Sequence, residues 1–239
     1  MPTRVVRMNV GLTNMAMGKE KKYFDGKQHH STRAFQTIPI GGIILPQDAT
    51  HTSLNLVGQG AGATQRDGRK ILIMGIRVRG EIRFLSGANW VGGDSVRLML
   101  VRDMQCNGTA PTPVSVLSGA GAGIATLAPL DNEGPRVTDL FMELANQNRY
   151  QILKDKTYTR NWTGLTSTDN PQEALLPFKL SYKWKNGMPT NYNGSSATPD
   201  ITAINDNNLF ILAIKNGLGG DSSGGGTDSV IDIAFASRL

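Results

Sequence analysis

The sequence predicts an all-β fold, a sandwich of antiparallel sheets in one domain, on three observations. First, apolar and charged side chains alternate strictly from Ile76 to Phe84, which is the period-two pattern of a half-buried strand. Second, segments 95–105 and 208–215 are apolar on both faces, which predicts strands at the centre of a sheet. Third, 28 glycines among 239 residues indicate many turns, and a hydrophobic content of 39% supports a core.

The alternating strand spans residues 70–85 and changes phase once. Its apolar face carries Ile76, Val78, Ile82 and Phe84, with Gly80 in register. Its other face carries Arg77, Arg79, Glu81 and Arg83. Upstream, Ile71 and Ile73 occupy the opposite phase and Gly75 stands at the break. A glycine at such a break predicts a β-bulge that turns the strand.

The other elements follow in chain order. Further strands are predicted at 34–45, 54–57, 150–154, 157–162, 177–185 and 230–237. Segments 150–154 and 157–162 would form a hairpin with its turn at Asp155-Lys156. Asn107-Gly108 is a further turn signal. Leu140, Phe141 and Leu144 recur at helical spacing, which predicts one short helix over 137–146. Polar or Gly-rich loops are expected at 118–123, 186–205 and 217–228.

About eight antiparallel strands with long connections are typical of an eight-stranded jelly-roll sandwich. A lipocalin-type barrel would have shorter and more even hairpin loops. The chain shows no internal repeat and no dividing linker, so residues 35–239 are expected to form a single domain that follows a flexible basic arm, residues 1–34.

The net charge of +6 is concentrated in this arm. Residues 1–36 carry seven basic and two acidic residues, whereas the remainder carries 18 basic and 17 acidic residues. The arm could bind a polyanion or be a solvated terminus, and charge alone does not decide between them. Its basic residues are Arg4, Arg7, Lys19, Lys21, Lys22, Lys27 and Arg33. The strand arginines Arg77, Arg79 and Arg83 are open to the same two interpretations, whereas Lys179, Lys183 and Lys185 favour a solvated outer face.

The search for catalytic and metal sites predicts no enzyme and no cofactor. His29 and His30 lie in the arm and His51 in a loop, so none forms a metal-binding pair on a rigid element, and Cys106 is the only cysteine. The Gly-rich loops lack the nucleotide-binding patterns. Loop acids could hold calcium, but scattered solvated acids explain them better; they are Asp200, Asp206, Asp221 and Asp228. No apolar run reaches the roughly 20 residues of a membrane span, and the first residues lack a signal-peptide core.

Four segments, in order, resemble the capsid proteins of circular Rep-encoding single-stranded DNA (CRESS-DNA) viruses, the circovirus-like group. The first is Gly58-Gln59-Gly60 followed by Arg66-Asp67-Gly68-Arg69-Lys70-Ile71 before a strand. The others are VRLMLVRDMQCNG, ending at Gly108, RYQILKDK at 149–156, and the closing strand 229–238. The resemblance covers residues 35–239. Coat proteins like that of satellite tobacco necrosis virus share the fold and are the nearest group with which this one could be confused.

The resemblance implies a single jelly-roll capsid protein that self-assembles into an icosahedral virion, a T=1 shell of about 60 copies. It implies packaging of single-stranded nucleic acid, circular ssDNA in that family, through basic contacts that do not read sequence. The arm is less basic than in the family, which weakens the expectation of import into a host nucleus. The alternative is a jelly-roll carbohydrate-binding module, which needs exposed aromatic residues. A cupin-type enzyme would need clustered histidines.

Overall fold

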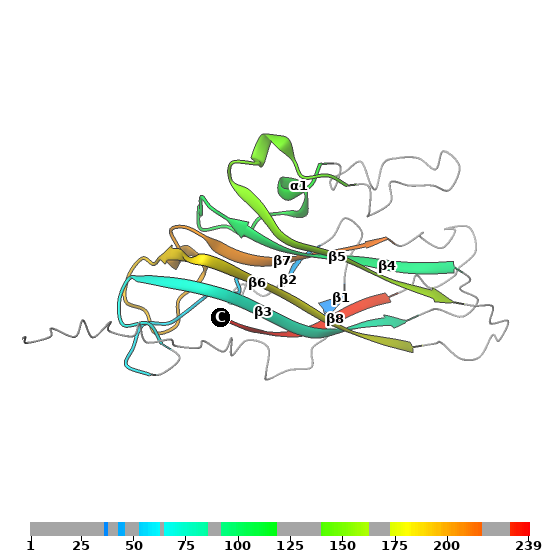
Figure 1. The fold of residues 1–239 in the computed structure, drawn as a ribbon, viewed down its shortest axis with the longest axis horizontal. Coiled ribbons are helices and arrows are strands. Elements are labelled where there is room, and N and C mark those ends of the chain that lie inside the picture. The colour runs from blue at the N-terminus through cyan, green and yellow to red at the C-terminus, as the bar shows by residue number, and fades with distance from the viewer. Residues whose placement is uncertain are drawn as a thin grey trace, which may run out of the picture.

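The computed structural model describes residues 36–37, 43–45, 53–62, 65–85, 92–118, 140–162, 173–216 and 230–239. The described chain is mostly β-strand in two antiparallel sheets that pack face to face, so the all-β prediction is confirmed (Figure 1). Six long strands are β3 (Lys70–Leu85), β4 (Gly92–Asp103), β5 (Tyr150–Trp162), β6 (Glu173–Asn191), β7 (Asn208–Asn216) and β8 (Val230–Arg238). Two short segments, β1 (Gln36–Thr37) and β2 (Ile43–Leu45), each pair with the edge of a sheet.

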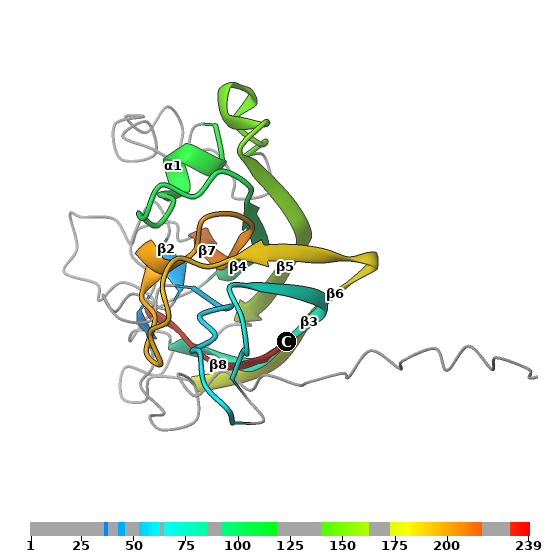
Figure 2. The same ribbon diagram turned by 90° about the vertical axis from the view of Figure 1, so that its left-hand side faces the viewer.

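The strand order in the first sheet is β1-β8-β3-β6, and in the second it is β2-β7-β4-β5. Successive strands along the chain therefore often change sheet: β3 is followed by β4 in the other sheet, and β5 by β6. Figure 2, which looks along the sandwich from one end, shows the two layers. Within the described residues, no helix is long and apolar enough to cross a membrane.

The main core lies between the sheets and confirms the predicted alternation of β3. Ile76, Val78, Ile82 and Phe84 are all buried there. They pack with the inward-facing side chains of the central strands, Val96, Leu98 and Leu100 of β4 and Leu209, Ile211 and Ala213 of β7. On the far side of that sheet, other residues of the two strands form a second core, namely Met99, Val101, Phe210, Leu212 and Ile214. Both-face burial of these two strands is thereby confirmed.

The predicted bulge lies where Gly75 stands. Ile73 is opposite Met188 of β6, but Gly75 is already opposite Lys183, so the register shifts there. The extra residues belong to β6, between Lys183 and Met188, rather than to β3. A Cβ on Gly75 would lie 3.0 Å from the Tyr182 carbonyl oxygen, a tight contact that requires the neighbouring strand to move by a few tenths of an ångström.

The predicted hairpin at Asp155-Lys156 is wrong, because β5 runs without interruption from Tyr150 to Trp162. Its ladder with β4 continues through this point, with Met99 opposite Asp155 and Leu98 opposite Lys156. Arg97 of β4 forms an ion pair with Asp155 at 2.5 Å, so this acid stabilises a strand pair rather than a turn. Local turn propensity is overridden by the partner strand.

The predicted helix over 137–146 is also wrong in the part described, residues 140–146. Only a 3-10 turn, η3 (Leu144–Asn146), forms there, and Phe141 and Leu144 are exposed instead of buried. Among the described residues the α-helix is α1 (Pro113–Val116), which begins after the capping residue Thr112 and has proline at its first position.

Three further boundaries differ from the predictions. Leu54 and Asn55 form a turn instead of opening a strand, and β6 extends to Asn191 into the predicted loop, which also contains the 3-10 turn η4 (Ile201–Ala203). The predicted strand over 34–45 is described only as β1 and β2, which belong to different sheets.

Candidate nucleic-acid interface

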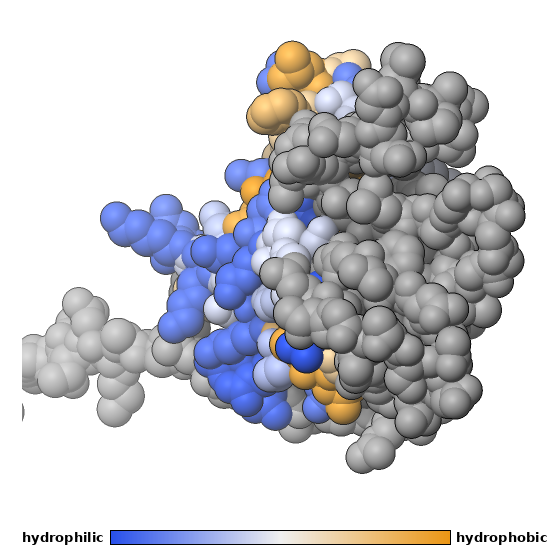
Figure 3. Space-filling view, turned by 90° about the vertical axis from the view of Figure 1, so that its right-hand side faces the viewer, coloured by the Kyte–Doolittle hydropathy of each residue, from blue (hydrophilic) through white to orange (hydrophobic). Residues whose placement is uncertain are grey.

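The outer face of the β8-β3-β6 sheet gathers basic side chains from three strands. Arg77 of β3 is opposite Arg238 of β8, and Arg79 is opposite Lys179 of β6. Side chains that are opposite one another in an antiparallel pair point to the same face. We call this surface the basic face and define it as Arg77, Arg79, Lys179, Lys183 and Arg238, all of which are exposed. Figure 3 shows hydrophilic atoms gathered on one side of the molecule, where Figure 2 places β3 and β6.

Three of the five cations of the basic face have no partner among the described residues. Glu81 is the single acid described on this face of β3, and it lies opposite Pro177 and Ala234. The side chains of Arg77, Arg79 and Lys179 make no hydrogen bond or ion pair with any residue that the structure describes. Because like charges opposite one another on a sheet repel, this surface is electrostatically suited to an anionic partner.

Arg83 differs from the other two strand arginines. It is half-buried, and in the register it lies opposite Asp232 of β8 and Leu175 of β6. Its place between an acid and a leucine, towards the end of the strand, separates it from the basic face. Arg77 and Arg79 are therefore the stronger candidates of the three predicted strand residues.

The seven predicted arm residues lie outside the described residues, and their role stays a prediction. Arg4, Arg7, Lys19, Lys21, Lys22, Lys27 and Arg33 make up this set. Sequence reasoning treated the β6 lysines and the β3 arginines as two separate rows and did not single out Arg238. Only the pairing of β3 with β6 and β8, which no local pattern reveals, joins them into one surface.

Arg66 in the Gly-rich lead-in has a structural role. It is 1% exposed, and its guanidinium donates to the carbonyl oxygens of Val57 (3.0 Å), Gly194 (3.1 Å) and Gly68. The guanidinium carbon also lies 4.5 Å from the centre of the Tyr192 ring. Burial lowers the pKa of Arg66, which is the cost of holding a cation among neutral groups. Arg66 thus fixes the lead-in loop against the end of β6 and is not available to phosphates.

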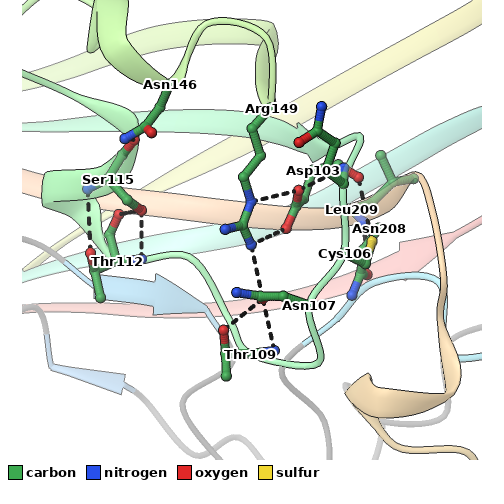
Figure 4. A network of polar contacts seen from close by, with 11 residues as sticks. Asp103, Cys106, Asn107, Thr109, Thr112, Ser115, Asn146, Arg149, Asn208 and Leu209 are labelled. Carbon is green, nitrogen blue, oxygen red and sulfur yellow. Dashed lines mark hydrogen bonds and ion pairs between the residues drawn. The ribbon is translucent and has the colours of Figure 1, made fainter.

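A second polar network joins two of the sequence motifs, VRLMLVRDMQCNG and RYQILKDK (Figure 4). Arg149, at the start of β5, donates to both carboxylate oxygens of Asp103, at the end of β4, over 3.1 and 3.0 Å. It also donates to Asn107 Oδ1, which in turn accepts from the Thr109 amide and hydroxyl. The hydrogen bond to Asp103 raises the pKa of Arg149. The pair closes the β4–β5 end of the sandwich, a role that neither motif reveals alone.

The loop acids that the sequence offered for calcium have internal partners where they are described. Asp200 accepts from the Thr202 amide as the cap of η4, and Asp206 accepts from the Asn191 amide at 2.7 Å. Asp221 and Asp228 lie outside the described residues. Within the described part, no group of three potential metal ligands is found. Cys106 is half-buried, and burial raises the pKa of its thiol to about 11, as expected for a packing residue.

A scan against protein-family models and a search of curated proteins both returned no match.

Proposed function

We propose that this chain is a jelly-roll capsid protein that assembles into an icosahedral shell around single-stranded nucleic acid. The strand order supports the jelly-roll assignment, because two four-stranded antiparallel sheets of order β1-β8-β3-β6 and β2-β7-β4-β5 correspond to two interleaved Greek keys. With the short β1 and β2 added to the six long strands, the arrangement has eight strands.

The observation that carries the proposal is the basic face. It places five exposed cations on one sheet surface, and three of them, Arg77, Arg79 and Lys179, have no side-chain partner among the described residues. Glu81 is the acid beside them on β3, and Asp232 of β8 and Glu173 of β6 lie farther along the sheet, opposite Arg83 and Leu85. Such a surface can neutralise phosphates without reading bases, as the interior of a shell must do for a genome of arbitrary sequence. The four motifs that resemble capsid proteins support the same function.

In this proposal the fold supplies the shape and the basic face supplies the affinity. Arg77 and Arg79 stand two residues apart on a strand, a spacing of about 7 Å. Lys179 and Arg238 flank them on the neighbouring strands, so the cations form a two-dimensional grid rather than a single line. A grid of this kind accepts a flexible phosphate backbone in several directions. The arm adds further interactions with phosphates.

The carbohydrate-binding alternative gains little from the two aromatic pairs that the structure describes. Tyr182 and Trp184 form an edge-to-face pair with ring centres 4.9 Å apart and pack against the main core. Tyr158 packs there too, edge-to-face with Phe178. A sugar-binding face would need such rings on its surface.

The test is to purify the full chain, image it by negative-stain electron microscopy and compare the absorbance at 260 and 280 nm. We expect uniform spherical particles that contain nucleic acid. Particles of Arg77→Gln with Arg79→Gln should carry less nucleic acid, because two cations that neutralise phosphates are removed. The slope of log affinity against log salt for a single-stranded oligonucleotide should shrink by roughly 0.7 for each cation removed from the phosphate backbone.

The matched control is Lys154→Gln with Lys156→Gln, which removes two exposed lysines from β5 of the other sheet. Its net charge equals that of the arginine variant, so an equal decrease in both would indicate a general charge effect instead of a site. Absence of particles under all assembly conditions would contradict the capsid function. Normal nucleic-acid content in particles of the arginine variant would show that the basic face is not the surface that binds nucleic acid.

A further inference from the structure

The segments 113–118 and 140–146 lie on the outer side of the β4–β7 sheet and expose large apolar side chains. Phe141 is 78% exposed, Leu144 73% and Val114 50%, and these are among the most exposed of the large apolar side chains described. We call these three residues the apolar platform. In Figure 3 hydrophobic atoms lie at the top of the molecule, where Figures 1 and 2 place α1 and η3.

The backbone of the two segments that carry the apolar platform is fixed by contacts with each other and with the sheet. Leu117 and Met142 form a β-bridge, and the amide of Ser118 donates to the Phe141 carbonyl at 2.9 Å. Arg97 on β4 donates to the Leu140 carbonyl at 2.7 Å, which ties the second segment to the sheet. Val116, Leu117 and Leu140 are buried in the second core. The platform side chains are therefore presented outward by a fixed backbone, as in a preformed binding surface.

Its chemistry excludes a polyanion as the partner. Neither segment contains a lysine or an arginine, and the only charged residue is Glu143. The Glu143 side chain accepts from the amide of Ala145 at 3.2 Å. A surface of phenylalanine, leucine and valine without cations suits an apolar protein surface, and exposed apolar groups of this size mark such interfaces.

A second exposed apolar pair lies on the other sheet of the same chain. Leu72 and Met74, near the bulge of β3, are 44% and 48% exposed. A chain that carries two apolar surfaces on opposite sheets can associate head to tail, the geometry that closes rings and shells. We propose that the apolar platform of one copy binds the Leu72–Met74 surface of a second copy of this chain. This inference rests on the proposed assembly function.

The size of the platform determines how strong one such interface can be. Stable interfaces bury about 800 Å² on each partner, and three side chains supply only part of that area. A single platform interface is therefore weak, and it holds only when repeated around a closed assembly. The protein should accordingly be monomeric when dilute and assemble above a threshold concentration.

The first experiment changes the platform to Phe141→Asp with Leu144→Asp. The control is Gln147→Asp with Asn148→Asp, two exposed residues directly after this segment that receive the same charge. Circular dichroism and thermal unfolding establish that both variants fold. We expect particle yield to fall about tenfold or more for the platform variant and to stay unchanged for the control.

The second experiment identifies the surface that the platform binds. Subunits with Phe141→Cys are mixed with subunits with Met74→Cys, each in a Cys106→Ser background, under mild oxidation at assembly concentrations. We expect a disulfide dimer in the mixture and none with either variant alone. A dimer from Phe141→Cys alone would overturn the head-to-tail interface in favour of a two-fold one.

Normal particle yield from the folded Asp variant would overturn the proposal entirely. Oligonucleotide affinity of the unassembled subunit is measured in parallel, because the basic face lies on the other sheet. Failure to assemble with intact affinity supports the platform interface. If instead wild-type subunits never assemble, the proposed capsid function fails first, and that result is visible before any variant is made.

Discussion

On β4 and β7, the side chains that point away from the centre of the sandwich are as buried as those that point into it, whereas on β3 and β6 the outward side chains are exposed and mostly polar. Met99 and Val101 of β4 are 0% exposed on their outer face, and the segments 113–118 and 140–142 cover them. Arg77 and Arg79 of β3 have no such cover. One sheet therefore has its outward side chains covered by its own chain, whereas the described outward side chains of the other sheet are mostly exposed.

This difference follows from the strand patterns. An outward face of leucine and valine must be buried, and burying each such side chain contributes about 1.5–3 kcal/mol. An outward face of arginine and lysine gains nothing from burial and would lose hydration. The segment that covers the apolar face of the β4–β7 sheet itself exposes Phe141 and Leu144. Covering this sheet therefore still leaves apolar side chains on the surface of the molecule.

The largest expected effect tests whether the covered face is a true core. Leu212→Ala, in the second core, and Leu209→Ala, in the main core, should each lower the free energy of unfolding by about 2–5 kcal/mol. Arg79→Ala on the basic face should change it by no more than about 0.5 kcal/mol. Urea unfolding of the three variants gives the comparison. If Leu212→Ala resembled Arg79→Ala, the covering segment would not be packed in solution.

A slightly smaller effect separates the buried arginine from the exposed ones. Arg66→Lys keeps the charge but removes the planar fork that reaches the Val57, Gly68 and Gly194 carbonyls, so buried acceptors are left without partners. We expect the free energy of unfolding to fall by about 2–4 kcal/mol. Arg77→Lys is the matched control and should be close to neutral. Equal stability of the two variants would show that Arg66 is solvated.

The next effect concerns the end of the covered sheet. Asp103→Asn removes the charge partner of Arg149 while keeping the shape of the side chain. Because Asp103 is almost fully buried and Arg149 remains a quarter exposed, we expect the free energy of unfolding to fall by about 1.5–3 kcal/mol. Asp155→Asn, whose partner Arg97 belongs to a more exposed pair, should cost less. The order of the two decreases in thermal unfolding checks this.

The two sheets also differ in how much of their structure could be predicted from the sequence. The alternation of β3, the register shift at Gly75 and the two-sided burial of β4 and β7 could be predicted, because each depends on a local pattern and a nearby hydrophobic requirement. That the extra residues belong to β6 could not be. The basic face could not be, because Lys179 and Arg238 join Arg79 and Arg77 only through strand pairing across long sequence separations. The burial of Arg66 and its role in the loop were missed for the same reason.

The errors also have a common cause. Asp155-Lys156 carries a local turn signal and 137–146 a helical spacing, yet partner strands and the underlying sheet override both. Leu140 does pack as the helical pattern suggests, but Phe141 and Leu144 do not. The apolar spacing therefore does not indicate a helix here, and two of its three residues lie on the surface.

The smallest expected effect measures how much the like charges of the basic face lower the free energy of unfolding. Lys179 lies opposite Arg79, whereas Lys183 lies opposite Gly75. Lys179→Glu replaces a repulsive cross-strand pair with an attractive one and should raise the free energy of unfolding by about 0.2–1 kcal/mol at low salt. Lys183→Glu makes the same change of charge without a directly opposed cation and should gain less. The difference between the two should shrink in 1 M salt, where the Debye length is about 3 Å.

Both variants should weaken oligonucleotide binding, so that greater stability and lower affinity occur together in Lys179→Glu. Identical stability of the two variants at low salt would mean that Arg79 and Lys179 do not repel one another across the strands, and the electrostatic argument for an anionic partner would lose its basis.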